Sequence, residues 1–322
     1  MNKVENLTVG GVPLLLESSV SLASGGSALP DVRELQNPYR TPFVIDEIVF
    51  LLRWIRSGGT DFTNFGASIR ARFAMGRVSV TSDHVPVWSF GPQIQGNSNV
   101  PPPTNNLVEG QSGLSGGVDS AGQLNTYSSF KWKLPVPLLV PPGNTLVPSF
   151  LRSADGMSGN VSVYVSYAGR RLESTFRMPA DIDVPYVALY ATERGADTGI
   201  SSELHLVNPF LVPMRVQRLT GRVEQILANP VPFGNVQEDF ALGLLDFPTD
   251  FGITMEDTYG YKVVKSTTPV GHVFDLPRRA WTFNKVLLPK ERYTVRLNGT
   301  AGSMSNRLLT IAMIGHRKER IA

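Results

Sequence analysis

The chain has 322 residues, 42% of them hydrophobic, which is enough for two domains of about 150 residues that each bury a core. Its 30 Gly and 24 Pro favour short strands and turns over helices, and the absence of cysteine excludes disulfides, thiolate catalysis and Cys-bound metals. The net charge is only +3, but its distribution along the chain is uneven.

The first 30 residues are predicted to form an N-terminal arm and a first strand. Residues 1–11 lack the basic and apolar segments of a secretion signal, and no run of 18 apolar residues in the chain predicts a transmembrane helix. Residues 23–31 have the composition of a flexible connection. Further strands of the first half are predicted at residues 43–55, 71–81, 84–90, 131–140, 145–151 and 161–167.

Residues 91–125 interrupt this series of strands. The segment is rich in Pro, Gly, Asn and Ser, and it has too little apolar surface to pack on its own. We therefore expect a long surface loop there.

The second half is predicted to contain strands at residues 214–223, 272–276, 280–288, 293–297 and 308–314. Asn235 and Glu238 have the spacing of an N-cap and its partner, and they precede the apolar segment 240–245. This pattern predicts one short helix.

The two halves repeat each other in order and spacing. Residues 12–16 match residues 184–188, and the Asn-Pro motif at 37–42 returns at 208–213. From Pro142 and Pro289 onward the halves align without a gap, so that Tyr167 falls on Ile314. Trp132 and Trp281 occupy matching places and are interpreted as core residues. Three blocks in one order predict two copies of one domain.

About eight strands in each copy of 140 to 170 residues exceed an immunoglobulin-type sandwich and fit an eight-stranded jelly roll. The predicted fold is all-β: two tandem jelly rolls with long loops and at most one or two short helices. Residues 1–30 would form the arm and first strand, 31–175 the first jelly roll and 176–322 the second.

No catalytic, cofactor-binding or metal-binding residue is predicted. The four histidines stand apart, without the His-x-His pair of metal-binding cupins, and are interpreted as structural: His84, His205, His272 and His316. No nucleophile elbow and no phosphate-binding loop are present. The acidic residues between 238 and 257 are interpreted mainly as a solvated face, with a structural cation or glycoside hydrolysis as alternatives. The chain is therefore not expected to be an enzyme.

The Asn-Pro motifs at 37–42 and 208–213, with the segments 132–171 and 281–318, give the chain a resemblance to a viral family. It resembles the double jelly-roll major capsid proteins of icosahedral viruses, the lineage of tailless, often membrane-containing bacteriophages and adenovirus-like viruses. The resemblance implies homotrimers of pseudo-hexagonal outline that tile a virion shell assembled in the host cytoplasm. It implies outer towers from residues 91–125 and 225–260, an arm (1–30) on neighbouring capsomers, and minor capsid or vertex proteins as partners.

The last part of the chain is basic. Residues 278–322 hold ten Lys or Arg against two Glu, a net charge of +8. Arg317, Lys318 and Arg320 are the candidates for an inward surface that contacts membrane or genome, and the alternative is a solvated strand end. A viral spike or vertex protein, or a carbohydrate-binding β-sandwich, remains the alternative function, with a β-sandwich enzyme behind it.

Overall fold

A computed structural model describes residues 11–56, 69–90, 93–97, 116–118, 124–152, 159–173, 175–191, 202–226, 236–238, 251–269, 280–299 and 307–320. Almost all regular structure in these residues is β, as predicted; the exception is a single turn of 3-10 helix, η2 (Val87–Ser89).

The first half of the chain forms two antiparallel sheets. One sheet has the order β1 (Val12–Leu22), β11 (Val161–Arg171), β3 (Phe43–Arg56), β9 (Leu124–Val140) and β7 (Gln93–Asn97), with β8 (Gly116–Val118) also on β9. The other has the order β2 (Ser27–Ala28), β10 (Val147–Arg152), β4 (Ile69–Met75) and β5 (Val78–Ser79), with β6 (Val85–Pro86) also on β4.

The second half forms two more sheets. The first has the order β12 (Asp181–Ala191), β20 (Arg307–Arg320), β14 (Met214–Ile226) and β15 (Val236–Glu238), with β18 (Ala280–Leu287) also on β14. The second has the order β13 (Ser202–Val207), β19 (Arg292–Gly299), β16 (Phe251–Glu256) and β17 (Lys262–Pro269).

Both halves have the same strand order. With β5 and β6 taken as one interrupted strand, and the additional short strands β7, β8 and β15 set aside, the described residues of each half form eight principal strands. They are divided between two sheets in the orders 1-8-3-6 and 2-7-4-5. This is the order of a jelly roll, in which successive strands cross between two facing sheets, except that the fourth and fifth are neighbours in one sheet. The predicted fold class, two tandem jelly rolls, is therefore confirmed.

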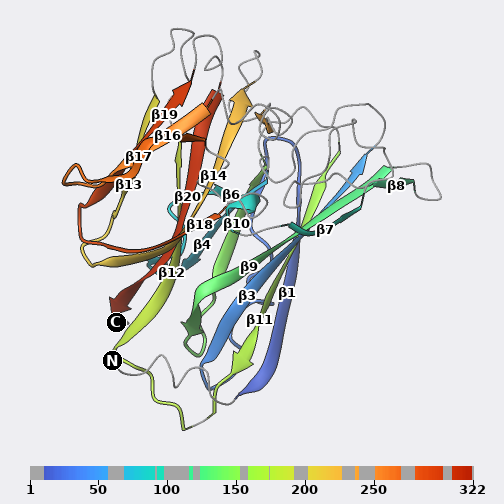
Figure 1. Cartoon of the computed structure of the whole chain (residues 1–322). Coiled ribbons are helices and arrows are strands. Elements are labelled where there is room, and N and C mark those ends of the chain that lie inside the picture. Colours follow the sequence, from blue (N-terminus) through green and yellow to red (C-terminus); the bar gives the residue numbers. More distant parts are fainter. Residues whose placement is uncertain are drawn as a thin grey trace.

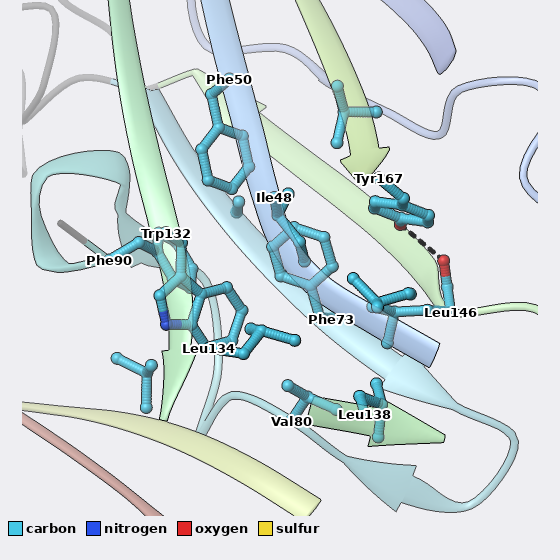
Figure 2. Close-up of a cluster of buried hydrophobic side chains, with 14 of the residues drawn as sticks. Ile48, Phe50, Phe73, Val80, Phe90, Trp132, Leu134, Leu138, Leu146 and Tyr167 are labelled. Atoms are coloured by element: carbon cyan, nitrogen blue, oxygen red, sulfur yellow. Dashed lines mark hydrogen bonds between the residues drawn. The ribbon is translucent and has the colours of Figure 1, made fainter. Parts of the chain in front are cut away.

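The larger core lies between the two sheets of the first half (Figure 2). Trp132 is fully buried, and its ring centroid lies 4.7 Å from that of Phe90 and 5.9 Å from that of Phe73. The inward side chains of β11 include Tyr167, whose hydroxyl donates a hydrogen bond of 2.6 Å to the carbonyl of Leu146. A second, smaller core lies within the second half.

The two halves stand side by side, with β9 of the first next to β12 of the second (Figure 1). The larger core continues across this boundary, because Val184, Val187 and Ile314 of the second half belong to the same buried cluster as Trp132. We call this boundary the seam.

Several local predictions differ from the structure. Residues 71–81 form a hairpin rather than one strand, because Gly76 adopts a φ of +59° between β4 and β5. The segment predicted as a strand at 84–90 is the short β6 followed by η2. The predicted loop 91–125 contains β7 and β8, which lengthen the sheet beside β9.

The predicted helix is only partly tested. Its N-terminal segment, Val236–Glu238, is strand β15 and pairs with β14, so the capping interpretation of Glu238 is wrong. Pairing with a neighbouring strand outweighed the local capping pattern. Residues 240–245, and the strand predicted at 272–276, lie outside the described residues.

The gap-free repeat alignment is wrong by one residue in the last strand of each half. β-bulges interrupt the pairing at Gly169 in β11 and at Gly315 in β20, which makes these two glycines equivalent. Tyr167 therefore corresponds to Met313, and both side chains enter the core of their own half. Ile314 faces the seam instead, because a one-residue shift moves a strand side chain to the other face.

Candidate interaction surfaces

The repeated Asn-Pro motif builds the same corner in both halves. Asn37 Nδ2 donates to the carbonyls of Thr41 and Val140, at 3.0 and 3.1 Å. Asn208 Nδ2 donates to the carbonyls of Val212 and Leu287, both at 2.9 Å. Each Asn Oδ1 accepts the backbone N–H two residues later at 2.9 Å. The motif is therefore a structural connection between the two sheets of each jelly roll, and it holds the end of the sixth strand in place.

At the seam, the first half adds backbone hydrogen bonds to the edge strand of the second. Val187 of β12 donates its N–H to the carbonyl of Val80 at 3.0 Å and accepts the N–H of Ser82 at 2.9 Å. Thr81 and Val187 form a parallel bridge. This pairing covers the middle of an edge strand that would otherwise expose unpaired peptide groups.

Arg317 joins the two halves through its side chain. It is 2% exposed, and Nη2 donates to the carbonyl of Ser79 in the first half at 2.9 Å. Nε donates to Glu319 at 2.6 Å, and Cζ lies 3.6 Å from the ring centroid of Phe210. A guanidinium on an aromatic face, hydrogen-bonded to a carboxylate and a carbonyl, is a stable buried arrangement for this cation.

Two further side chains of β14 reach across the seam. Gln217 Nε2 donates to the carbonyl of Pro135 at 3.3 Å, and Arg218 Nη2 donates to the carbonyl of Phe90 at the same distance. Gln217 is the extra residue of the bulge opposite Gly315, so the bulge directs it toward β9.

Burial shifts the acidity of several seam residues. It lowers the pKa of Arg218, and it lowers the pKa of Arg317 against the opposing effect of Glu319. Burial also raises the pKa of Tyr186 to about 12, because the phenolate would be poorly solvated there. The pKa of His316 is lowered by burial and by Arg215, against the opposing charge of Asp183.

The three basic residues selected from the sequence do not share one surface. Arg317 is buried in the seam, whereas Lys318 and Arg320 are exposed, because alternate residues of β20 face opposite sides of the sheet. Arg317 is therefore used inside the chain, and only Lys318 and Arg320 are available for a surface contact.

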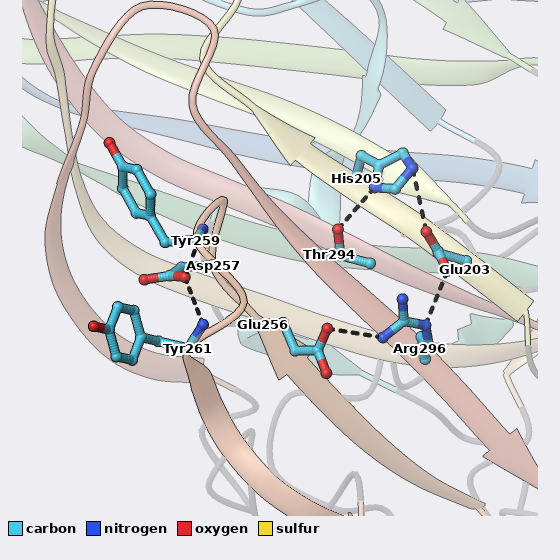
Figure 3. A network of polar contacts seen from close by, with 8 residues as sticks. All are labelled: Glu203, His205, Glu256, Asp257, Tyr259, Tyr261, Thr294 and Arg296. Carbon is cyan, nitrogen blue, oxygen red and sulfur yellow. Dashed lines mark hydrogen bonds and ion pairs between the residues drawn. The ribbon is translucent and has the colours of Figure 1, made fainter.

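A polar network covers the outer face of the last sheet (Figure 3). Arg296 Nε donates to Glu203 at 2.9 Å, and its Nη1 donates to Glu256 at 3.1 Å. His205 lies 3.4 Å from Glu203 through Nε2 and 3.2 Å from Thr294 Oγ1 through Nδ1. Partly exposed pairs of this kind contribute little stability and are solvated in the single chain.

Beside this network, the turn after β16 carries two exposed aromatic side chains. Asp257 Oδ1 accepts the backbone N–H groups of Tyr259 and Tyr261, each at 2.9 Å. The two rings extend away from the strands and are 72% and 74% exposed (Figure 3). Leu211, in the turn before β14, is 89% exposed. Exposed aromatic side chains on an ordered turn are typical of contact surfaces.

The described residues hold no cluster of three or more His, Asp or Glu able to bind a metal. His84 Nε2 bonds Ser149 Oγ at 2.9 Å, and His316 Nδ1 lies 3.4 Å from Gln217, so these histidines have structural partners; His272 lies outside the described residues. Of the acidic residues, Glu256 pairs with Arg296 and Asp257 shapes its turn. No described helix is long and apolar enough to cross a membrane.

No protein-family model matches the sequence, and no curated protein matches it. Among solved structures, a chain of the Sputnik virophage is similar at 9% identity and a TM-score of 0.39, over 96% of this chain and 87% of that one. The mavirus major capsid protein is similar at 8% identity and a TM-score of 0.35, with the same coverage. A chain of Sulfolobus turreted icosahedral virus is similar at 10% identity and a TM-score of 0.24, over 97% and 61%. Because these identities and TM-scores are low, we assign the fold from the strand order alone.

Proposed function

We propose that this chain is a structural protein, the major capsid protein of an icosahedral virus, and that it forms pseudo-hexameric homotrimers that tile the virion shell. The observation that carries the proposal is the seam. Two jelly rolls of one strand order are fixed side by side by a continuous core, backbone pairing and a buried Arg317. One chain is thus a rigid block with two similar units, and three such blocks supply six units around one axis.

The domain division follows from this proposal. Residues 31–175 and 176–322 would be the two jelly rolls, with β1 of the segment 1–30 completing the first sheet. The outer towers expected at 91–125 and 225–260 would exclude β16, because its Ile253 and Met255 are core residues. The arm expected at 1–30 would be limited to residues 1–11 as a contact with neighbouring capsomers, because β1 and β2 belong to the first jelly roll. Minor capsid or vertex proteins are the further partners, and the host cytoplasm is the site of assembly.

A basic inner surface is the least constrained part of the proposal. With Arg317 buried, the contact with membrane or genome rests on Lys318 and Arg320. If K318A/R320A particles assembled and packaged their contents like the wild type, this role would be withdrawn.

The test is the native mass of the purified chain by light scattering, followed by negative-stain imaging. A trimer near three times 35.2 kDa with a hexagonal outline, or closed shells, supports the proposal. A monomer, or an elongated oligomer with its domains in a row, favours the second candidate, a spike, vertex or carbohydrate-binding protein. Exposed Tyr259 and Tyr261 are the observation that favours this candidate.

A further inference from the structure

Two surfaces meet at the seam, one from the first half and one from the second. Because the halves are repeats, each half also has a surface equivalent to the one that the other half contributes. Within the chain, β9 and residues 79–82 of the first half meet β12 and β20 of the second. By strand order, β1 and β11 are the counterparts of β12 and β20, and β18 and β17 are the counterparts of β9 and β5. We call β1 with β11 the β1 side, and β17 with β18 the β18 side.

The β1 side has an exposed apolar residue at a position whose counterpart in the second half is buried in the seam. Val187 lies opposite Ile314 in its sheet, and Leu15 lies opposite Ala168; the matched bulges make these two positions equivalent. Val187 is fully buried, whereas Leu15 is 58% exposed. β1 is the last strand in its sheet order, so no described strand pairs with its outer edge. An exposed apolar edge strand of this length is a docking site.

The β1 side also carries a counterpart of Arg317. Arg171 has its Cζ 4.8 Å from the ring centroid of Tyr39, just as Arg317 stands over Phe210. Arg317 also donates from Nη2 to a carbonyl across the seam, that of Ser79. Arg171 is only partly buried, and it is placed to make the equivalent bond to a second chain.

The β18 side shows the complementary difference. Leu139 of β9 lies opposite Val44, and Val286 of β18 lies opposite Arg215, which occupies the same place in its strand as Val44. Leu139 is 1% exposed and belongs to the core cluster that crosses the seam, whereas Val286 is 54% exposed. Leu288, just beyond β18, is 49% exposed.

The edge strand β17 supplies the backbone of the β18 side. In the second half, Lys262 of β17 pairs with Glu256 of β16; in the first half, Ser79 of β5 pairs with Ala74 of β4. The start of β17 is therefore the counterpart of the first-half segment that pairs with β12. β17 is the last strand of its sheet order, and Tyr261 immediately before it is 74% exposed. An aromatic ring at this place can anchor a contact near Arg171 of a second copy.

The exposed counterparts are more polar than the seam itself. Asp46 and Arg170 form an ion pair at 2.9 Å where the seam has Gln217 and His316. Glu17 stands where the seam has Leu189. A surface that is solvated before a partner arrives combines an apolar centre with a polar rim in this way.

We infer that the β1 side of one copy docks on the β18 side of a second copy, so that the contact between chains repeats the seam within the chain. This inference rests on the proposed function and names the surfaces that the assembly uses. The contact is heterologous, because each chain offers one side and accepts the other, and such contacts close into a ring when the rotation between neighbours is one third of a turn, as in the proposed trimer.

The test uses two single substitutions at exposed positions, L15D on the β1 side and V286D on the β18 side, followed by sedimentation velocity. A carboxylate buried without a partner weakens the contact, and we expect at least about a 100-fold rise in the dissociation constant for each. L211D is the matched control. Leu211 is 89% exposed and its counterpart Arg40 is exposed too, so this position lies outside the seam in both halves.

A mixture of the two variants then separates this contact from a symmetric one. V286D keeps an intact β1 side and L15D keeps an intact β18 side, so the mixture should form a one-to-one pair near twice 35.2 kDa and no larger species. Formation of the pair also shows that both variants are folded. Variants that assemble like L211D, or a mixture that stays monomeric, overturn the inference while the capsid proposal stands. A monomeric wild type overturns both.

Discussion

At the residue scale, the seam depends on side chains that are kept neutral or paired. His316 stands in the seam with Nδ1 3.4 Å from the amide nitrogen of Gln217, an arrangement in which the ring nitrogen accepts and is therefore unprotonated. Gln217 in turn donates to the first half at Pro135. Protonation of His316 would remove the acceptor and place a charge beside Arg215.

The pH dependence of stability follows from this arrangement. Burial holds the pKa of His316 below its ordinary value of 6.5, so below that pH the unfolded chain binds more protons than the folded one. The free energy of unfolding should therefore fall as pH drops through 6.5 and level off below the folded pKa. Urea unfolding at several pH values should show this loss in the wild type and a smaller one in H316Q.

Equal loss in the wild type and in H316Q would mean that other groups cause the acid sensitivity.

At the element scale, each half depends on one bulge that lets two backbones approach closely. A Cβ built on Gly169 would lie 1.8 Å from the carbonyl oxygen of Val44, and one built on Gly315 would lie 2.2 Å from that of Arg215. Backbone atoms in the middle of a sheet cannot move aside without breaking neighbouring pairs. These two glycines therefore fix the register of β11 on β3 and of β20 on β14.

We accordingly expect G169A and G315A each to lower the free energy of unfolding by at least about 3 kcal/mol, or to prevent folding. G76A is the matched control. Its φ is +59° but no atom lies within 4 Å of the added Cβ, so it should cost only about 1–2 kcal/mol. Chemical denaturation of the three variants measures this order, and a G169A protein as stable as G76A would contradict it.

At the scale of the whole molecule, the seam makes one cooperative unit out of two jelly rolls. The larger core extends from Trp132 to Val187 and Ile314, so neither half buries its apolar surface completely when alone. Arg317 is the polar contact that closes one end of this boundary. Separation of the halves would expose the edge of β12, with its peptide groups unpaired.

We predict that R317M, which keeps the aliphatic packing but loses the hydrogen bonds to Ser79 and Glu319, lowers the free energy of unfolding by about 2–3 kcal/mol. Its urea unfolding should also separate into two transitions as the halves uncouple. R320M removes an exposed arginine from the same strand and should stay within about 0.5 kcal/mol of the wild type. Similar curves for both variants would exclude a structural role for Arg317 across the seam.

Strand patterns and the internal repeat were enough to predict the fold class. Alternation marks β11, and the two Asn-Pro motifs form matching turns, because each Asn bonds backbone groups two and four residues further along the chain. The alignment of Tyr167 with Ile314 was wrong because the first half has one more residue between Asn144 and Gly169 than the second half has between Glu291 and Gly315, and apolar alternation does not reveal this difference. Arg317 was taken for a surface residue because charge by itself carries no information about burial.

The sequence by itself determined what depends on near neighbours along the chain: many of the strands, the turns at Asn37 and Asn208, and the duplication. Tertiary structure decided which faces are covered. Leu15 and Val187 are equivalent apolar residues on edge strands, yet one is exposed and the other buried. The difference arises because β9 and residues 79–82 pack against the second half and have no described counterpart against the first. Contacts between residues about a hundred positions apart set this asymmetry, and no local pattern encodes it.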